Sequence, residues 1–384
     1  MRRDIPPVPA SKPRLAGKHV ERGNFVSEWF GHRVYPTVAA GRRVLQDQAA
    51  SRCPFLSAVT QEDKQCVKPA SSVGVCTISS CSNGPRQDWL VCPYRALDSV
   101  LLEEAATRLF DLKGNAPLMI IPAPTLASEE TRRRLAGQVS AGNPAIVYLQ
   151  DKLGGEISIS ATERSPEMAF DITMAQIVAE GHTLSVSRYG ILEVQTMDFH
   201  GSYRYAVSNL KDALRLHRED FPRVLQQNPG WLSDHIEGPN IANVFKRTFY
   251  QIMLKFQIGA HKSCAGCVLA LPSSVWDSWQ RHLGKPVLRA NRDGTFTLAR
   301  PSRRPTVGKK PAWIFVFDVR SDDQKSPNRL DLRSVIATDA ASVSHYALNV
   351  APGAAVGAGG SADRLLATIQ RRLAMWWPEL ASAS

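Results

Sequence analysis

The sequence predicts an α/β protein, and three patterns support this fold class. Apolar residues alternate with small or polar ones through 168–174, which is the period of two of a β-strand. A second strand is predicted at 190–195, where apolar residues surround Glu193. The stretch 241–256 instead has apolar residues at positions typical of one helix face. With 384 residues and 43% hydrophobic content, the chain can bury a large core around such elements.

The charge balance favours a polyanionic partner. Lys and Arg number 47 against 35 Asp and Glu, which gives a net charge of +12 and a pI of about 9.5. Basic clusters at 132–134, 303–310 and 371–372 predict contacts with a phosphate backbone and a steep dependence of binding on salt. The alternative is a soluble protein whose basic charge has no such role.

The first segment, 1–23, is predicted to be a disordered basic arm, because it is rich in Pro, Lys and Arg. Such an arm either touches phosphates or is a tail without function. It contains no apolar stretch, and the longest apolar runs of the chain are too short to cross a bilayer. We therefore expect a cytoplasmic protein with no membrane partner.

The next segment, 24–110, holds five of the seven cysteines. In a reducing compartment, clustered thiols more often bind a metal than form disulfides. Cys81 lies in a polar turn, so the predicted ligands of a closed, structural zinc or iron site are the other four, Cys53, Cys66, Cys76 and Cys92. Unrelated thiols are the alternative, because no CxxC pair occurs in this segment.

The segment 111–335 carries the predicted chemistry. The strand period places Asp171 on a polar face, and Glu193 and Gln195, two residues apart, must point to one face. Two carboxylates and an amide oxygen are hard ligands suited to Mg²⁺ and its bound phosphates. The trio therefore predicts a metal-dependent phosphodiesterase centre. Glu156 and Glu163 are weaker candidates for a further metal-binding carboxylate, and each is otherwise a surface or DNA-facing residue.

Two further helices are predicted from the sequence. The helix predicted after Pro239 and a capping Asn240 carries a further face at i, i+4 and i+8, formed by Arg247, Gln251 and Lys255. This face is a solvated surface by default, or else a phosphate path or a dimer seam. The last segment, 336–384, is predicted to be an Ala/Gly linker and an amphipathic helix that packs on the body or on a partner.

Several segments, in this order along the chain, together resemble the NotI-like type II restriction endonucleases. They are NFVSEWFGHRVYP, CPFL, GVC, DWLVCP, APTLA, QDKLGGEISIS, SPEMAFDIT, RYGILEVQTMDFHGSY, NVFKRTFYQ, SVWDSWQRHL and AWIFVF. The resemblance implies a PD-(D/E)xK nuclease core, which is a mixed central sheet flanked by helices, with an N-terminal four-cysteine metal-binding insert. It implies that Asp171, Glu193 and Gln195 are the catalytic trio, in which glutamine replaces the usual lysine, and that Asp171 and Glu193 bind Mg²⁺.

The resemblance also implies the substrate and the partners. The expected substrate is double-stranded DNA with a GC-rich palindromic site containing a GGCC core, and the four cysteines are expected to hold structural iron. A two-fold homodimer is the simplest way to read a palindrome and cut both strands. A cognate DNA methyltransferase is expected in the same host.

Charged residues near the trio are candidates for reading G·C pairs, because Arg and Lys suit guanine and acidic groups suit cytosine N4. The predicted DNA contacts are Lys152, Glu163, Arg164, Arg188, Asp198 and Arg204. Each of them is otherwise a solvated surface charge. Two other functions stay open at this stage: a sequence-specific DNA-binding protein without hydrolytic activity, and a repair nuclease with the same core.

Overall fold

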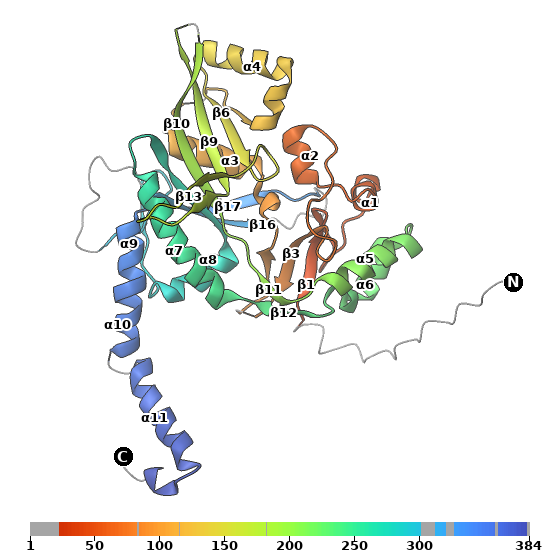
Figure 1. The fold of residues 1–384 in the computed structure, drawn as a ribbon. Coiled ribbons are helices and arrows are strands. Elements are labelled where there is room, and N and C mark those ends of the chain that lie inside the picture. Colours follow the sequence, from red (N-terminus) through yellow and green to blue (C-terminus); the bar gives the residue numbers. More distant parts are fainter. Residues whose placement is uncertain are drawn as a thin grey trace, which may run out of the picture.

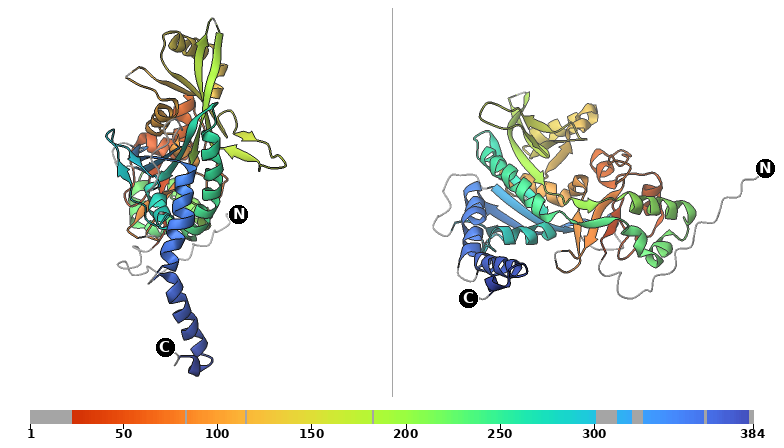
Figure 2. Two further views of the ribbon diagram at one scale, coloured as in Figure 1. Left: turned by 90° about the vertical axis from the view of Figure 1, so that its left-hand side faces the viewer. Right: turned by 60° about the horizontal axis from the view of Figure 1, so that its bottom comes forward.

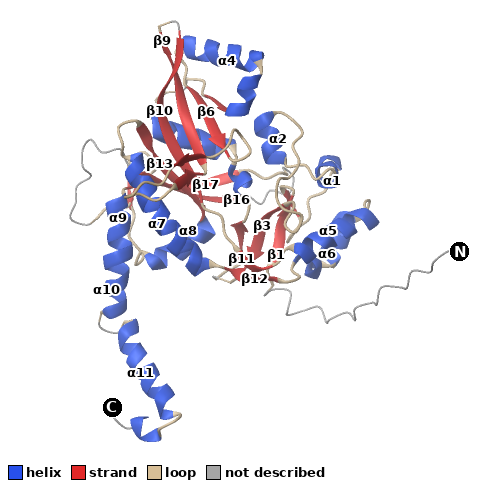
Figure 3. Cartoon of the chain, viewed as in Figure 1, coloured by secondary structure: helices blue, strands red, loops and turns tan. Residues whose placement is uncertain are grey.

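The computed structural model describes residues 23–82, 84–114, 116–181, 183–300, 312–319, 326–357 and 360–381. The basic cluster predicted at 303–310, and all but the last residue of the predicted arm at 1–23, lie outside these residues. The described chain is a mixed α/β protein, as predicted. A large sheet with helices on both faces stands beside a smaller N-terminal sheet (Figures 1 and 3).

The large sheet has nine strands. They are β5 (Met119–Pro122), β6 (Ala145–Gln150), β9 (Ile172–Glu180), β10 (Thr183–Val194), β13 (Cys264–Pro272), β14 (Arg289–Ala290), β15 (Phe296–Thr297), β16 (Ala312–Val319) and β17 (Leu330–Thr338). Their order across the sheet is β14-β15-β17-β16-β13-β10-β9-β6-β5. The central strands β10, β13 and β16 run parallel, whereas β9 is antiparallel to both β10 and β6.

The helices are mostly short. They are α1 (Arg42–Ala49), α2 (Pro54–Thr60), α3 (Ser99–Phe110), α4 (Glu129–Ser140), α5 (Arg204–Leu216), α6 (Phe221–Gln227), α7 (Ile241–Gly259), α8 (Ser273–His282), α9 (Ala340–His345), α10 (Ala351–Val356) and α11 (Ser361–Ala374). Among the described residues, no helix combines the length and the apolar character needed to cross a membrane.

Alternation along β13 explains how both faces of the large sheet are covered. Val268 and Ala270 belong to the apolar cluster that includes α3. Cys267, Leu269 and Leu271 belong to the cluster that includes α7 and α8. Successive side chains of a strand point to opposite faces, so one apolar strand packs against helices on two sides. The CxxC of Cys264 and Cys267 lies inside this strand and is fully buried.

The N-terminal sheet is antiparallel, with the order β2-β1-β3-β4. Its strands are β1 (Phe25–Trp29), β2 (His32–Arg33), β3 (Val75–Ser80) and β4 (Gln87–Leu90). A buried ion pair joins it to the rest of the chain. The guanidinium of Arg95 donates to both carboxylate oxygens of Glu28, at 3.0 and 3.3 Å, and to the backbone carbonyl of Asn328.

Loss of one partner of this ion pair is expected to destabilise the fold strongly. Glu28 and Arg95 are both fully buried, so Arg95→Met would leave a buried carboxylate without its partner. Breaking such a pair costs about 3–5 kcal/mol. Urea denaturation should show this loss, whereas Arg333→Met, which removes an exposed pair with Asp318, should leave the midpoint unchanged. Equal midpoints for Arg95→Met and the wild type would contradict this account.

The C-terminal segment differs in part from the prediction. The first half of the Ala/Gly stretch, predicted to be a linker, forms helix α10. The predicted terminal amphipathic helix is present as α11, and with α10 it extends away from the body of the molecule (Figure 2).

Candidate active site

The two predicted metal-binding carboxylates lie side by side on neighbouring strands. Strands β9 and β10 pair with Ile172 opposite Leu192, and this register brings Asp171 next to Glu193. The backbone N–H of Asp171 donates to Glu193 Oε1 at 3.3 Å, and the N–H of Val194 donates to Asp171 Oδ2 at 2.9 Å. Each carboxylate is thus oriented by the backbone of the adjacent strand.

Asp171 does not lie on the polar face of one continuous strand, as the period of two predicted. The chain changes partner at this residue. Before it, β8 (Met168–Phe170) pairs with β7 (Ile157–Ile159) in a two-stranded ribbon, and after it β9 joins the large sheet. Asp171 therefore occupies the junction between the ribbon and the sheet, where its side chain faces the site.

Gln195 directly follows β10, and hydrogen bonds fix both its backbone and its side-chain amide. Its backbone N–H donates to the carbonyl of Ala270 at 2.8 Å. In the side chain, Oε1 accepts a hydrogen bond from the hydroxyl of Thr248, and Nε2 donates to the carbonyl of Thr196. The two-residue spacing predicted that Gln195 and Glu193 share a face, and both line one cavity.

Lys255 brings a positive charge into the site from helix α7. Its ammonium donates to Glu193 Oε2, and both side chains are less than a tenth exposed. The ammonium also lies 5.7 Å from the ring centroid of Phe170. The sequence trio contains no cation, because Gln195 is neutral, so the structure supplies the missing charge from a residue distant in sequence.

The face predicted on this helix at i, i+4 and i+8 turns towards the carboxylates. Arg247, Gln251 and Lys255 all line a cavity of about 530 Å³ that also contains Asp171 and Glu193. The default interpretation, a solvated face, holds for Arg247 and Gln251, which are exposed, and is wrong for Lys255, which is buried. The contact of Lys255 with Glu193 was not predicted, although the place of Lys255 on that face and the neutral side chain of Gln195 are both visible in the sequence.

The electrostatics of the site are unusual for a carboxylate pair. The pKa of Glu193 is raised to about 8, because of burial first and the charge of Asp171 second, against the opposing effect of Lys255. Glu156 also has a raised pKa, caused by burial and then by Asp171, which shows that its charge interacts with the site. Perturbed acids in a cavity are typical of functional sites.

The six predicted DNA contacts do not form one group, and none of them lines the cavity itself. Glu163 and Arg164 are exposed at the tip of the β7–β8 ribbon, and Asp198 accepts from the cavity-lining Arg247 at 3.0 Å. Of these three, Asp198 is in direct contact with a residue of the cavity.

The remaining three predicted contacts lie elsewhere in the structure. Lys152 is exposed and pairs with Asp151 at 3.1 Å. Arg204 is exposed at the start of α5. Arg188 is half-buried and donates to the carbonyl of Phe110 at 3.2 Å and to Gln176 Oε1 at 3.3 Å, so its guanidinium ties β10 to α3 and β9.

The four predicted cysteine ligands line one small cavity of about 10 Å³. Within the described residues, however, no group of three or more His, Cys, Asp and Glu side chains is arranged to hold a metal ion. The structure therefore does not show the predicted closed site. The thiols are free and make other contacts: the Cys76 thiol is hydrogen-bonded to the Cys92 sulfur and donates to the carbonyl of Gly74. Burial raises the pKa of Cys53 to about 12.

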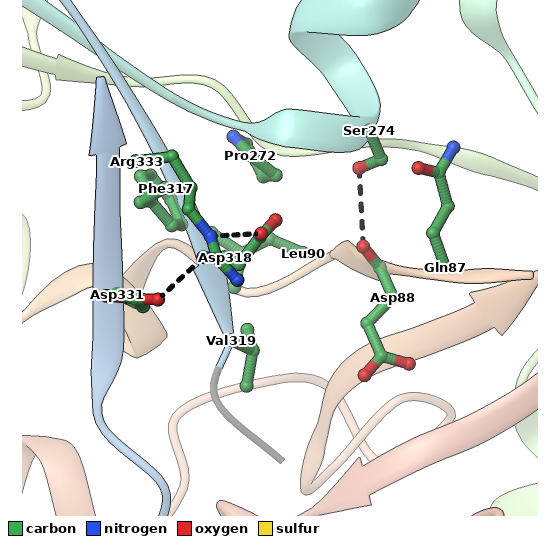
Figure 4. Close-up of a pocket in the computed structure, with 10 residues that line it drawn as sticks. All are labelled: Gln87, Asp88, Leu90, Pro272, Ser274, Phe317, Asp318, Val319, Asp331 and Arg333. Carbon is green, nitrogen blue, oxygen red and sulfur yellow. Dashed lines mark hydrogen bonds and ion pairs between the residues drawn. The ribbon is translucent and has the colours of Figure 1, made fainter. Parts of the chain in front are cut away.

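A second cavity, of about 540 Å³, lies where β4, β13, β16 and β17 approach one another (Figure 4). Its charged groups neutralise each other. Arg333 contacts Asp318 at 2.8 Å and Asp331 at 3.2 Å, and the Asp88 carboxylate pairs with Arg33 at 2.5 Å. Each carboxylate of this cavity therefore lies against a guanidinium, whereas the Asp171 carboxylate of the first cavity accepts from a backbone N–H.

The chain matches no protein-family model, and a search of curated proteins found no significant match.

Proposed function

We propose that this protein is a Mg²⁺-dependent type II restriction endonuclease that cuts both strands of double-stranded DNA at a GC-rich palindrome with a GGCC-containing core. The observation that carries the proposal is the meeting of Asp171, Glu193 and the Lys255 ammonium in one open cavity. This set contains what phosphodiester hydrolysis requires, namely ligands for a divalent cation and a positive charge near the reacting phosphate. The basic net charge fits a nucleic-acid substrate.

The residues present fit Mg²⁺. Asp171 and Glu193 would hold it through hard carboxylate oxygens. Among the described residues, Val194 engages only Oδ2 of Asp171, and Oδ1 stays available for a ligand. Bound Mg²⁺ would supply charge stabilisation and a water of lowered pKa.

The other side chains orient the substrate in this proposal. Lys255 donates to Glu193 in the free protein, and its ammonium would turn to an oxygen of the scissile phosphate as the cation engages the carboxylate. Thr248 fixes the amide of Gln195, so that this amide can position the attacking water. Arg247 and the 62% exposed Tyr250 would contact the DNA backbone at the edge of the cavity.

Incubation of the purified protein with phage DNA and Mg²⁺ tests the proposal. Discrete fragments whose sequenced ends share one palindrome would support it, and EDTA should stop the reaction. Methylation of that palindrome should protect the DNA, since a cognate methyltransferase is part of the proposal. Binding without cleavage would favour a DNA-binding protein, and nicking at damaged or branched DNA would favour a repair nuclease.

The Mg²⁺ requirement is expected to depend on pH. Below about pH 8 the Glu193 carboxyl of the metal-free protein carries a proton, which the cation must displace. The Mg²⁺ affinity should therefore fall as the pH falls, by roughly tenfold per unit for one proton, and level off above about pH 8. Calorimetric Mg²⁺ titrations across this range would measure it. The same affinity at every pH would exclude Glu193 as the titrating ligand, and Glu193→Gln should remove the dependence.

A structural iron or zinc is a separate proposal. Its support is that all four thiols line one cavity and that two sulfurs accept N–H groups, Cys66 from Gly74 and Cys76 from Gly31, each at 3.3 Å. Elemental analysis of protein purified without added metal should find about one equivalent, lost in Cys92→Ser and kept in the control Cys81→Ser. Metal-free wild-type protein with normal stability would refute it.

A further inference from the structure

Tyr94 is a buried tyrosine whose hydroxyl contacts the large sheet at the end of strand β6. It lies on the short 3₁₀ helix η2 (Pro93–Ala96) and is 6% exposed. Its hydroxyl donates to Asp151 Oδ2 at 2.7 Å, and the side-chain amide of Gln150 is hydrogen-bonded to the same hydroxyl. A hydrogen bond to a carboxylate is about twice as strong as one between neutral groups. Tyr94 thus holds the last residue of β6 and the first residue of the loop that follows.

The backbone that carries Tyr94 is itself held firmly. The next residue, Arg95, is fully buried in the ion pair with Glu28. The backbone N–H of Arg95 donates to the carbonyl of Cys92 at 3.1 Å, which closes the turn of η2 around Tyr94. Such support matters, because a side chain can position another group only if its own place is fixed.

The protonation states of the two groups suit this hydrogen bond. Burial first, and the Asp151 carboxylate second, raise the pKa of Tyr94, so the hydroxyl keeps the proton that it donates. The same hydrogen bond is the first cause of the lowered pKa of Asp151. Lys152 contacts the other oxygen of Asp151 at 3.1 Å, but both of these side chains are exposed, and such a pair contributes little. Tyr94 is therefore the main anchor of this carboxylate.

The loop that Tyr94 holds leads directly to the candidate active site. The backbone N–H of Leu153 donates to the carbonyl of Gln150 at 2.7 Å, and the N–H of Gln150 donates back at 3.1 Å. Gly154 and Gly155 follow with φ angles of +98° and +87°, which glycine adopts without strain. They turn the chain into Glu156 and the ribbon strand β7.

Glu156 and Asp171 are the two ends of the ribbon that meet the large sheet. The ribbon pairs Ile157 with Phe170, so the next residues outward, Glu156 and Asp171, stand opposite each other. The charge of Asp171 accordingly contributes, after burial, to the raised pKa of Glu156. Asp171 is fixed by the backbone of β10. The position of Glu156 follows instead from the loop before it.

We propose that Tyr94 is a positioning residue of the candidate active site, whose hydroxyl fixes the loop before Glu156 and thereby sets Glu156 opposite Asp171. One hydrogen bond across 57 residues of sequence joins η2 to this site. Tyr94 touches no reacting group, because it does not line the catalytic cavity. The proposal deepens the proposed function, and its effect on cleavage rests on that function.

Tyr94→Phe tests the hold on the loop without any substrate. It removes the hydroxyl and keeps the ring, so the packing should be preserved. The N–H groups of Leu153 and Gly155 both donate to one carbonyl of the loop. Their hydrogen exchange, followed by mass spectrometry, should become faster by about fivefold or more, as expected for the loss of one buried hydrogen bond.

Asp151→Ala removes the same hydrogen bond from its exposed side, so the fold should persist even if Tyr94→Phe lowers the stability. Each variant should reduce single-turnover cleavage with Mg²⁺ by about tenfold to a hundredfold, the range for residues that orient a site from behind. The double variant should be no slower than either single variant. A role limited to packing would instead give Tyr94→Phe the same factor with and without Asp151, and that result would contradict the proposal.

Tyr346→Phe is the matched control, because it also removes one buried hydroxyl, which donates to the carbonyl of Ala299 at 3.2 Å. It should change neither the exchange of the loop nor the cleavage rate. Unchanged loop exchange in Tyr94→Phe would overturn the proposal whatever the nuclease activity, and so would cleavage by this variant at the wild-type rate. A wild type that cuts no DNA would refute the proposed function, and the exchange alone would then decide whether Tyr94 holds the loop.

Discussion

Asp171→Asn is expected to abolish DNA cleavage while specific binding is retained. Asparagine keeps an oxygen that can accept the 2.9 Å hydrogen bond from the Val194 N–H, so the local fold should persist. It removes the negative charge that would attract the cation. We expect the rate to fall by about a thousandfold or more, which corresponds to about 4 kcal/mol of activation free energy. Single-turnover cleavage with Mg²⁺ and gel-shift assays with Ca²⁺ would measure the two properties separately.

The control for this substitution is Asp212→Asn, which removes an exposed carboxylate that pairs with Arg215 on helix α5. It should cleave at the wild-type rate. If Asp171→Asn also cleaved at that rate, the carboxylates of this cavity would not be the catalytic ligands, and the proposed function would lose the observation that carries it.

Lys255→Met is expected to reduce cleavage by about a hundredfold to a thousandfold, the range found when one preorganised group that stabilises transition-state charge is removed. Methionine matches the length and apolar stem of lysine, so packing beside Phe170 should be preserved. The pKa of Glu193, which Lys255 lowers, should rise further in this variant. The variant should therefore also need more Mg²⁺ at neutral pH, and raising the pH should restore the Mg²⁺ affinity but not the rate.

Lys246→Met is the matched control, because Lys246 is an exposed lysine on the same helix. Its effect should be confined to weaker, salt-sensitive DNA binding. Unchanged cleavage in Lys255→Met at saturating Mg²⁺ would mean that the ammonium only neutralises Glu193 in the free protein. In that case the charge for the phosphate would have to come from another group.

Local patterns in the sequence predicted much of the candidate site. The alternation around Glu193 and Gln195 requires the two side chains to share a face, and both line the cavity. The helix period placed Arg247, Gln251 and Lys255 on one face, which lines the same cavity. These predictions succeeded because strand and helix periods are properties of the backbone over a few residues.

The same local patterns failed where the chain changes its partner. The alternation through 168–174 predicted one strand, but the first residues pair in a ribbon and the later ones join the large sheet. The four cysteines predicted as metal ligands line one cavity, but within the described residues they do not form a metal site, and their orientation depends on contacts with Gly31 and Gly74 that their positions in the sequence do not specify.

By itself, the sequence determined which chemical groups are available and which of them share a strand or helix face, because those relations are set by backbone geometry between near neighbours. Only the tertiary structure decided that Lys255 meets Glu193, 62 residues away, and that the apolar face of α11 is left uncovered. The physical reason is that such contacts depend on the order of strands in the sheet. Strand β10 lies beside β13, and α7, the last helix of the chain segment between them, packs against both and carries Lys255 to the carboxylates.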